Sequence, residues 1–320
     1  MSAFNQSCPN PDTFLLTGIP GLESQHVWIA IPFCIMYVIA LLGNGAVLYV
    51  VKQDETLHEP MYYFLSMLAL IDLVFSTAAV PKMLSIFWLD SKEISFESCF
   101  IQMFFIHTFT VVESGVLLAM SYDRYVAICN PLRYKTILSN PKIALIGLMS
   151  LARGVGVITS LICFLTSLPY CKTNVIPHSY CEHMAVVGMA DTDSSASDLY
   201  SVVVATALVA ADSMCIAFSY GTILRSIVRL SSHEARLKAF STCSSHICVI
   251  LLFYVGGLLS MYLHKFDLRL ARHTQVLLAD LYLVIPPMLN PIVYGMKAKH
   301  VRQRVLKLLG QRQILAEPSI

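Results

Sequence analysis

Seven long apolar stretches constrain the fold of this chain more than any other feature. They lie near residues 26–51, 60–83, 97–124, 142–167, 198–227, 238–263 and 273–295. Each is long enough to cross the hydrocarbon core of a bilayer as a helix, which takes about 20 residues. Only helices and closed barrels satisfy their backbone in lipid, and these runs are continuous and do not alternate as barrel strands do. The sequence therefore predicts an all-α membrane protein, a seven-transmembrane helix bundle.

The composition agrees with a bilayer as the solvent. The chain is 56% hydrophobic and only 13% charged, whereas soluble domains carry about 25% charged residues. Membrane lipids are thus expected partners. No basic tract with interleaved aromatic residues is present, which argues against a nucleic-acid partner. The first fourteen residues show no signal-peptide pattern, so the first span is expected to act as its own insertion signal.

The distribution of Lys and Arg predicts the orientation of the bundle. Fifteen of the 22 basic residues fall on the side that holds the C-terminus, and this side is expected to face the cytoplasm of a multi-pass plasma-membrane protein. We expect an extracellular N-terminus (1–25), a transmembrane domain (26–295) and a cytoplasmic amphipathic helix with a tail (296–320). In the last segment the apolar positions Val301, Val305, Leu308 and Leu309 recur among basic residues. Asn5 opens a glycosylation sequon on the predicted outer side.

The ten cysteines divide into two groups. Six are expected to be reduced packing residues within the spans or at the cytoplasmic face: Cys34, Cys129, Cys163, Cys215, Cys243 and Cys248. Cys8, Cys99, Cys171 and Cys181 fall on the oxidising side, where disulfides persist. A bridge from Cys99 to the long loop after the fourth span would pin that loop over the mouth of the bundle. The C-x-x-C spacing of a metal site is absent from the sequence.

Several polar residues lie inside the predicted spans. Asp72 and Glu113 would repel each other across one cavity unless a proton or a cation such as sodium lies between them. The alternative is that one of them is protonated and hydrogen-bonded to a neighbouring helix. Asn290-Pro291 interrupts the seventh span and is either a hinge or a static kink. Asp123-Arg124 lies where the third span leaves the lipid, as a functional ion pair or a snorkelling arginine.

Sequence motifs along the whole chain point to one family. They are Gly43-Asn44, PMY at 60–62, LALID at 68–72, MSYDRYVAICNPLRY at 120–134, Ser219-Tyr220, KAFSTCSSH at 238–246 and PPMLNPIVY at 286–294. In this order and spacing they resemble a rhodopsin-like G-protein-coupled receptor. HEPMYYFL at 58–65 and KAFSTCSSH resemble olfactory (odorant) receptors in particular. The opening FLLTGIPGLE at 14–23 and the loop LPYCKTNVIPHSYCEHM at 168–184 resemble the class I, fish-like branch of that family.

The resemblance implies a function and assigns roles to residues. It implies sensory transduction, in which a small water-soluble odorant, often a carboxylic acid or a similarly polar aliphatic, activates a stimulatory olfactory G protein and raises cyclic AMP. The residues expected to couple to the G protein or to act as the switch are Asp123, Arg124, Tyr125, Tyr220, Lys238, Asn290, Pro291 and Tyr294. Asp72 and Glu113 match the sodium-site carboxylates of the family, and Cys99–Cys181 matches its disulfide. The third cysteine usual in the loop is replaced by Asp191, so Cys171 is either free or paired with Cys8.

The resemblance also places an odorant pocket between the outer halves of the third, fifth and sixth spans. Its expected lining is His107, Thr110, Val204, Leu208, Gly257, Leu258, Met261 and Lys265. Lys265 replaces the usual arginine as the anchor for a carboxylate, which keeps the charge and loses the bidentate geometry. The alternatives are that it is solvated or pairs with Asp267, Asp280 or Asp191. His107 is either a ligand contact or a packed histidine, and Arg153 has no partner evident in the sequence.

Two other classes of function were weighed. A transporter or channel is expected to show substrate-coordinating broken helices in paired halves, and the sequence has only one broken helix. A membrane enzyme would need a catalytic signature, and the H-E-x-x-H and G-x-S-x-G patterns are absent from the sequence. We therefore expect a receptor and not an enzyme.

Overall fold

The chain folds into seven long helices, as its hydropathy predicts. The computed structural model describes residues 10–171, 173–190, 195–229, 232–265 and 271–297. Seven of its helices are long and apolar enough to cross a membrane. These are α1 (His26–Gln53), α2 (Pro60–Leu89), α3 (Phe96–Cys129), α5 (Asn140–Thr166), α7 (Ser195–Val228), α8 (His233–Lys265) and α9 (Arg272–Lys297). The prediction of a seven-helix bundle is confirmed. The amphipathic helix predicted within 296–320, apart from its first two residues, and the glycosylation site at Asn5 lie outside the described residues.

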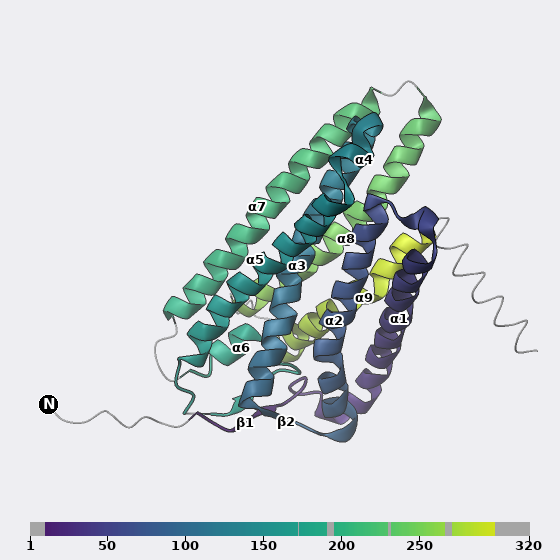
Figure 1. Cartoon of the computed structure of the whole chain (residues 1–320). Coiled ribbons are helices and arrows are strands. Elements are labelled where there is room, and N and C mark those ends of the chain that lie inside the picture. Colours follow the sequence, from purple (N-terminus) through teal and green to yellow (C-terminus); the bar gives the residue numbers. More distant parts are fainter. Residues whose placement is uncertain (1–9, 172, 191–194, 230–231, 266–270, 298–320) are drawn as a thin grey trace, which may run out of the picture.

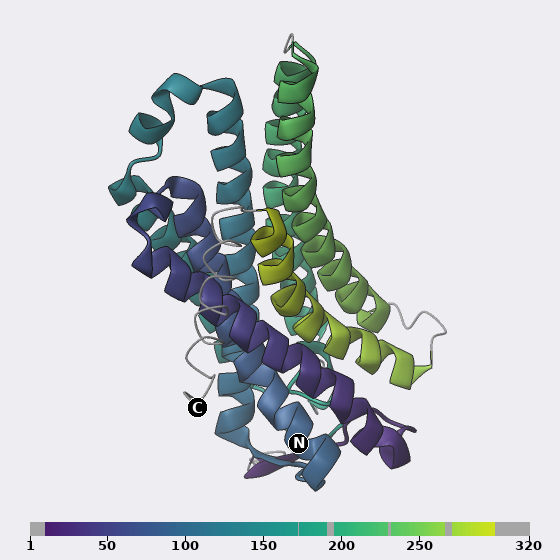
Figure 2. The same ribbon diagram turned by 90° about the vertical axis from the view of Figure 1, so that its right-hand side faces the viewer.

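The seven helices pack side by side with α3 near the centre. Helix α3 contacts α2, α5, α7 and α8, while α9 contacts α1, α2 and α8. Figure 2 shows α9 (yellow-green) lying between α1 (purple) and the green α8. The central position of α3 matters because this one helix carries candidate functional residues in both halves, from His107 to Arg124.

The two ends of the bundle differ in structure (Figure 1). At one end, which we call the sheet end, β1 (Thr13–Leu16) lies between β2 (Glu93–Ser95) and β3 (Val175–Ile176). It pairs antiparallel with β2 and parallel with β3. The short helices η1 (Glu23–Gln25) and α6 (His183–Val187) also lie at this end. The opposite end carries η2 (Glu55–Leu57), η3 (Pro131–Arg133) and α4 (Tyr134–Ile137), and we call it the α4 end.

The N-terminal segment is packed against the sheet end. Phe14, Leu16 and Ile19 are completely buried and belong to the apolar cluster of that end. The sequence predicts residues 1–25 only as an extracellular segment and carries no signal for this strand. The end of the bundle is therefore covered by buried side chains from all three strands, β1, β2 and β3.

The backbone carbonyl that Pro291 leaves unbonded in α9 accepts a hydrogen bond from α1. Pro291 lacks the N–H that would bond to the carbonyl of residue 287 in a regular helix. The side-chain amide of Asn44 donates to that Pro287 oxygen at 2.9 Å and to the Ala40 oxygen at 3.0 Å. A Cβ at Gly43 would lie 2.8 Å from Cγ of Pro291. Gly43-Asn44 and Pro291 thus form one packing unit between α1 and α9.

Candidate functional site

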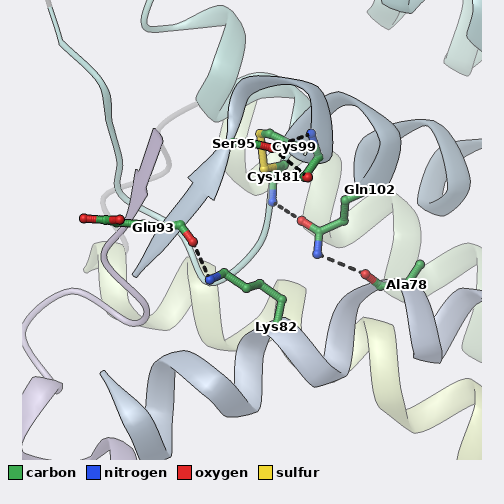
Figure 3. Close-up of a disulfide and its surroundings, with 8 residues drawn as sticks. Ala78, Lys82, Glu93, Ser95, Cys99, Gln102 and Cys181 are labelled. Carbon is green, nitrogen blue, oxygen red and sulfur yellow. Dashed lines mark hydrogen bonds between the residues drawn. A yellow bond between two sulfur atoms is a disulfide. The ribbon is translucent and has the colours of Figure 1, made fainter. Parts of the chain in front are cut away.

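A disulfide fixes the loop between α5 and α7 onto the bundle. Cys99, in the first turn of α3, is bonded to Cys181 of the loop, with 5.5 Å between the Cα atoms. Beside it, Gln102 accepts a hydrogen bond from the Cys181 backbone N–H at 2.9 Å and donates to the Ala78 oxygen at 3.0 Å (Figure 3). The predicted bridge is confirmed, and it joins α2, α3 and the loop.

Cys171 also forms a disulfide. Its partner lies outside the described residues, as does Cys8. The alternative in which Cys171 is a free thiol is therefore wrong. A second covalent link ties the start of this loop down even though Asp191 replaces the usual loop cysteine.

Beneath this loop lies a partly open cavity of about 230 Å³. Its walls come from α3, α5, α7, α8 and α9, and its roof comes from the loop. Seven of the residues expected to line an odorant pocket do line this cavity: His107, Thr110, Val204, Leu208, Gly257, Leu258 and Met261. The side chain of Lys265 lies outside the described residues. The backbone of α8 reaches Lys265 one turn after Met261.

The roof of the cavity contains residues that the sequence analysis missed. Tyr180, Glu182, His183 and Met184 line it from the loop. They flank Cys181, so the available signal was the disulfide itself, because a loop pinned at that cysteine must place its neighbours over the bundle. On the α3 wall, His107 Nε2 is buried without a hydrogen-bond partner among the described residues. The His107 ring lies edge-on to that of His183, with centroids 6.1 Å apart.

The floor of the cavity is a polar network that spans four helices. Arg153 of α5 donates from both Nη atoms to the carboxylate of Asp212 of α7, each at 2.9 Å. Ser114 of α3 donates to the same carboxylate at 2.5 Å, and its hydroxyl also bonds to that of Tyr254 of α8 at 2.8 Å. Arg153, Ser114 and Tyr254 line the cavity. Arg153, for which the sequence suggested no partner, is therefore half of an ion pair with the buried Asp212.

Glu113, next to Ser114 in α3, and Asp72 of α2 are the two carboxylates predicted to hold a cation. Both oxygens of Asp72 accept hydrogen bonds from the Asn290 amide at 3.1 Å. Glu113 Oε1 and Asn290 Oδ1 are buried without a hydrogen-bond partner among the described residues. These two oxygens could act as ligands of a hard cation such as sodium, which binds oxygen atoms.

At the α4 end the predicted ion pair is present. Arg124 Nη2 lies 2.8 Å from a carboxylate oxygen of Asp123, and the Tyr134 hydroxyl donates to the other oxygen at 2.6 Å. Asp123 is buried and Arg124 is nearly so. Burial and the adjacent Asp123 raise the pKa of Tyr134, which keeps its hydroxyl a neutral donor. The sequence analysis did not identify Tyr134 as a partner in this lock.

The remaining switch residues surround this lock. The Tyr220 hydroxyl bonds to Nδ1 of the buried His246, which joins α7 to α8. Tyr125 and Tyr294 are partly buried against the apolar cluster that contains Tyr220. Pro291 is buried beside Gly43, and the side chain of Lys238 lies outside the described residues. The Tyr220–His246 hydrogen bond thus connects α7 to α8 toward the α4 end. The network of Ser114, Asp212 and Tyr254 connects the same helices through α3 at the cavity floor.

Comparison with known proteins identifies the family. The family model described as "Olfactory receptor" matches residues 33–312. The chain belongs to the olfactory receptor family. The human olfactory receptor 52K2 is 49% identical over 98% of this chain and 100% of its own length. The human olfactory receptor 52D1 is 50% identical over 93% of this chain and 94% of its own. The fold resembles squid rhodopsin, with a TM-score of 0.74 over 94% of this chain and 89% of the other, at 16% identity.

Membership of this family establishes the general function of the protein. The receptor is a multi-pass plasma-membrane protein that responds to odorants through a G protein, and it is not an enzyme. The cavity under the disulfide-pinned loop is the site suited to a small molecule, since it is concave, largely apolar and lined by a few polar groups.

Proposed function

We propose that this receptor binds aliphatic carboxylic acids, or similarly polar aliphatics, in the cavity between α3, α7 and α8. Bound ligand would activate a stimulatory olfactory-type G protein and raise cyclic AMP. The observation that carries the proposal is the cavity of about 230 Å³ under the loop, with mostly apolar walls. A volume of this size suits a short aliphatic ligand. The wall residues Val204, Leu208, Leu258 and Met261 favour an alkyl chain.

The proposed anchor for the ligand's head group is Lys265. Residues four apart in a helix share a face, and Met261, which lines the cavity, precedes Lys265 by one turn of α8. An ammonium there would attract a carboxylate as a point charge. His107, buried on the α3 wall with an unpaired Nε2, is proposed as a second polar contact.

The cavity floor supplies a route from ligand to G protein. Tyr254 lines the cavity and is held by Ser114, whose hydroxyl is bonded to Asp212. A ligand that moves the Tyr254 side chain changes the attachment of α8 to α3. About two turns of α8 closer to the α4 end, His246 bonds to Tyr220. We propose that ligand shifts the population toward a state in which this end of α8 separates and Arg124 leaves Asp123.

The proposed orientation has the sheet end outside the cell and the α4 end in the cytoplasm. Among the described residues, Lys52, Arg133, Lys135, Lys142 and Arg225 lie at or near the α4 end. An excess of basic residues is typical of cytoplasmic loops. A sodium ion held by Asp72 and Glu113 is proposed to stabilise the resting state. Replacing sodium by a bulky organic cation is then expected to raise basal cyclic AMP, and Asp72→Asn is expected to abolish that sensitivity.

A cyclic AMP assay tests the main proposal. Cells that express the receptor with an olfactory G protein are exposed to fatty acids and to alcohols, aldehydes and lactones of matched length. We expect acids to be the most potent. Lys265→Ala should raise the half-maximal concentration of the best acid at least tenfold, whereas Lys92→Ala, which removes a cation paired with Asp90 at the same end, should leave it unchanged.

Two results would overturn parts of this proposal. Equal potency of the best acid on wild type and Lys265→Ala would exclude the anchor. An unaltered response in Arg124→Ala, at equal surface expression, would exclude the switch at the α4 end.

A further inference from the structure

An open groove of about 490 Å³ lies between α2, β2 and α3 at the sheet end. It is separate from the cavity, and the two share no lining residue. Lys82 of α2 lies on one wall, Ser95 and Ser98 form the rim, and Ile101 and Phe105 of α3 form the lower wall. The groove therefore has a cation and hydroxyl groups near the sheet end and apolar side chains farther along α3.

The Lys82 ammonium is hydrogen-bonded but forms no direct ion pair within the described part of the chain, and the carboxylate of Glu93, which also lines the groove, attracts it only from a longer distance. Its Nζ donates to the backbone oxygens of Ser91 at 2.8 Å and Glu93 at 2.6 Å. These carbonyls satisfy two of its three N–H groups and carry no net charge. Among the described residues Lys82 forms no ion pair. Figure 3 shows the Glu93 backbone oxygen facing Lys82 while its carboxylate points away.

The position of Lys82 along α2 places it at the boundary between headgroups and hydrocarbon. Helix α2 has 30 residues, a length of about 45 Å against a hydrocarbon core of about 30 Å. A centred helix extends about 7 Å beyond each face, and Lys82 lies about 10 Å from the end at Leu89. The side chain reaches back toward the loop carbonyls, as a snorkelling lysine does.

The α3 wall supplies the complementary parts. Ser95 Oγ donates to Ser98 Oγ at 2.7 Å, and the Ser98 proton has no acceptor among the described residues. Below this rim, Ile101 is 57% exposed and Phe105 is 41% exposed. They lie one and two turns deeper than the serines, at the level of acyl chains. A phosphate beside Lys82 and Ser98 with a chain over Ile101 and Phe105 would match each feature.

We propose that this groove binds one phospholipid from the leaflet at the sheet end. Its phosphodiester would pair with Lys82 and accept from Ser98, and one acyl chain would cover Ile101 and Phe105. The bound lipid would brace the α2–α3 junction beside the Cys99–Cys181 bridge. The inference does not depend on the identity of the odorant.

Native mass spectrometry of the purified full-length receptor tests the site. The probes are phosphatidylcholine and a diacylglycerol with the same chains but no phosphate. We expect wild type and Lys82→Arg to retain one phosphatidylcholine, and Lys82→Gln to retain at least fivefold less. Lys92→Gln is the matched control, because Lys92 carries the same charge at the same end outside the groove. It should behave as wild type.

Ser98→Trp keeps Lys82 and fills the groove, so it tests the site even where Lys82→Gln fails to fold. It should also lose the lipid. Formation of the Cys99–Cys181 bridge, read from the intact mass, reports folding of each variant. Equal retention by wild type and Ser98→Trp, equal retention of the diacylglycerol, or preferential retention of cholesterol would each overturn the proposal.

Discussion

Arg153 and Asp212 form a two-pronged ion pair between α5 and α7, with both Nη atoms 2.9 Å from the carboxylate oxygens. The Asp212 side chain is only 5% exposed. Charges at this depth are costly in a membrane protein unless they are paired. The pair therefore fixes the position of α7 relative to α5 directly below the cavity.

The first prediction concerns this pair. Arg153→Leu leaves the buried carboxylate of Asp212 without its partner, which should cost about 3–5 kcal/mol. Asp212→Leu leaves a guanidinium that is 28% exposed, so its loss should be smaller. The double variant removes both charges and should recover most of the loss. The measurement is the thermal midpoint of purified receptor, and additive losses in the double variant would show that the two charges act independently.

The second prediction concerns the link to α8. Tyr254→Phe removes the hydrogen bond to Ser114, which is worth about 1 kcal/mol, or about a fivefold change in an equilibrium. If this bond holds α8 in the resting state, basal cyclic AMP should rise several-fold. Tyr122→Phe is the control, because Tyr122 is 42% exposed and does not line the cavity. Lower basal signalling in Tyr254→Phe would instead assign the bond to the active state.

The third prediction compares two glycines of α5. A Cβ at Gly154 would lie 2.8 Å from the Thr108 backbone oxygen and 3.0 Å from Val112, whereas a Cβ at Gly156 would meet nothing within 4 Å. Gly154→Ala must push α5 away from α3 and should cost about 1–3 kcal/mol. Gly156→Ala should be neutral or stabilise the helix by up to about 1 kcal/mol. Thermal midpoints of the two variants test this, and equal midpoints would contradict the close approach at Gly154.

The sequence predicts the seven helices well and the contacts between them poorly, for a physical reason. A span needs about 20 apolar residues whatever it packs against. It can therefore be recognised from its own stretch of sequence. The partner of Arg153 lies 59 residues away on another helix, and nothing local to either residue specifies the pairing. Asn44 illustrates the intermediate case. Its polarity within a span marks it as a bonded residue, but only the structure shows that it satisfies the carbonyl freed by Pro291.

The sheet end was the least predictable part. Strand β1 has four residues and is formed only because β2 and β3 present their edges to it. Such a short segment carries no periodicity that separates a strand from a loop. The roof residues Tyr180 and His183 were missed for a related reason, because their position depends on the disulfide at Cys181 and not on a pattern of their own.

The last prediction concerns ligand length. Each methylene buried in an apolar site contributes about 0.8 kcal/mol, so the half-maximal concentration should fall about fourfold per added carbon until the chain fills the cavity. Val204→Phe fills part of that space from the α7 wall, which should move the optimum to a shorter acid. Val203→Phe is the matched control, because Val203 is 56% exposed and does not line the cavity. Dose-response curves for a homologous acid series give both optima. If the two phenylalanine variants share the wild-type optimum, the alkyl chain does not lie against Val204.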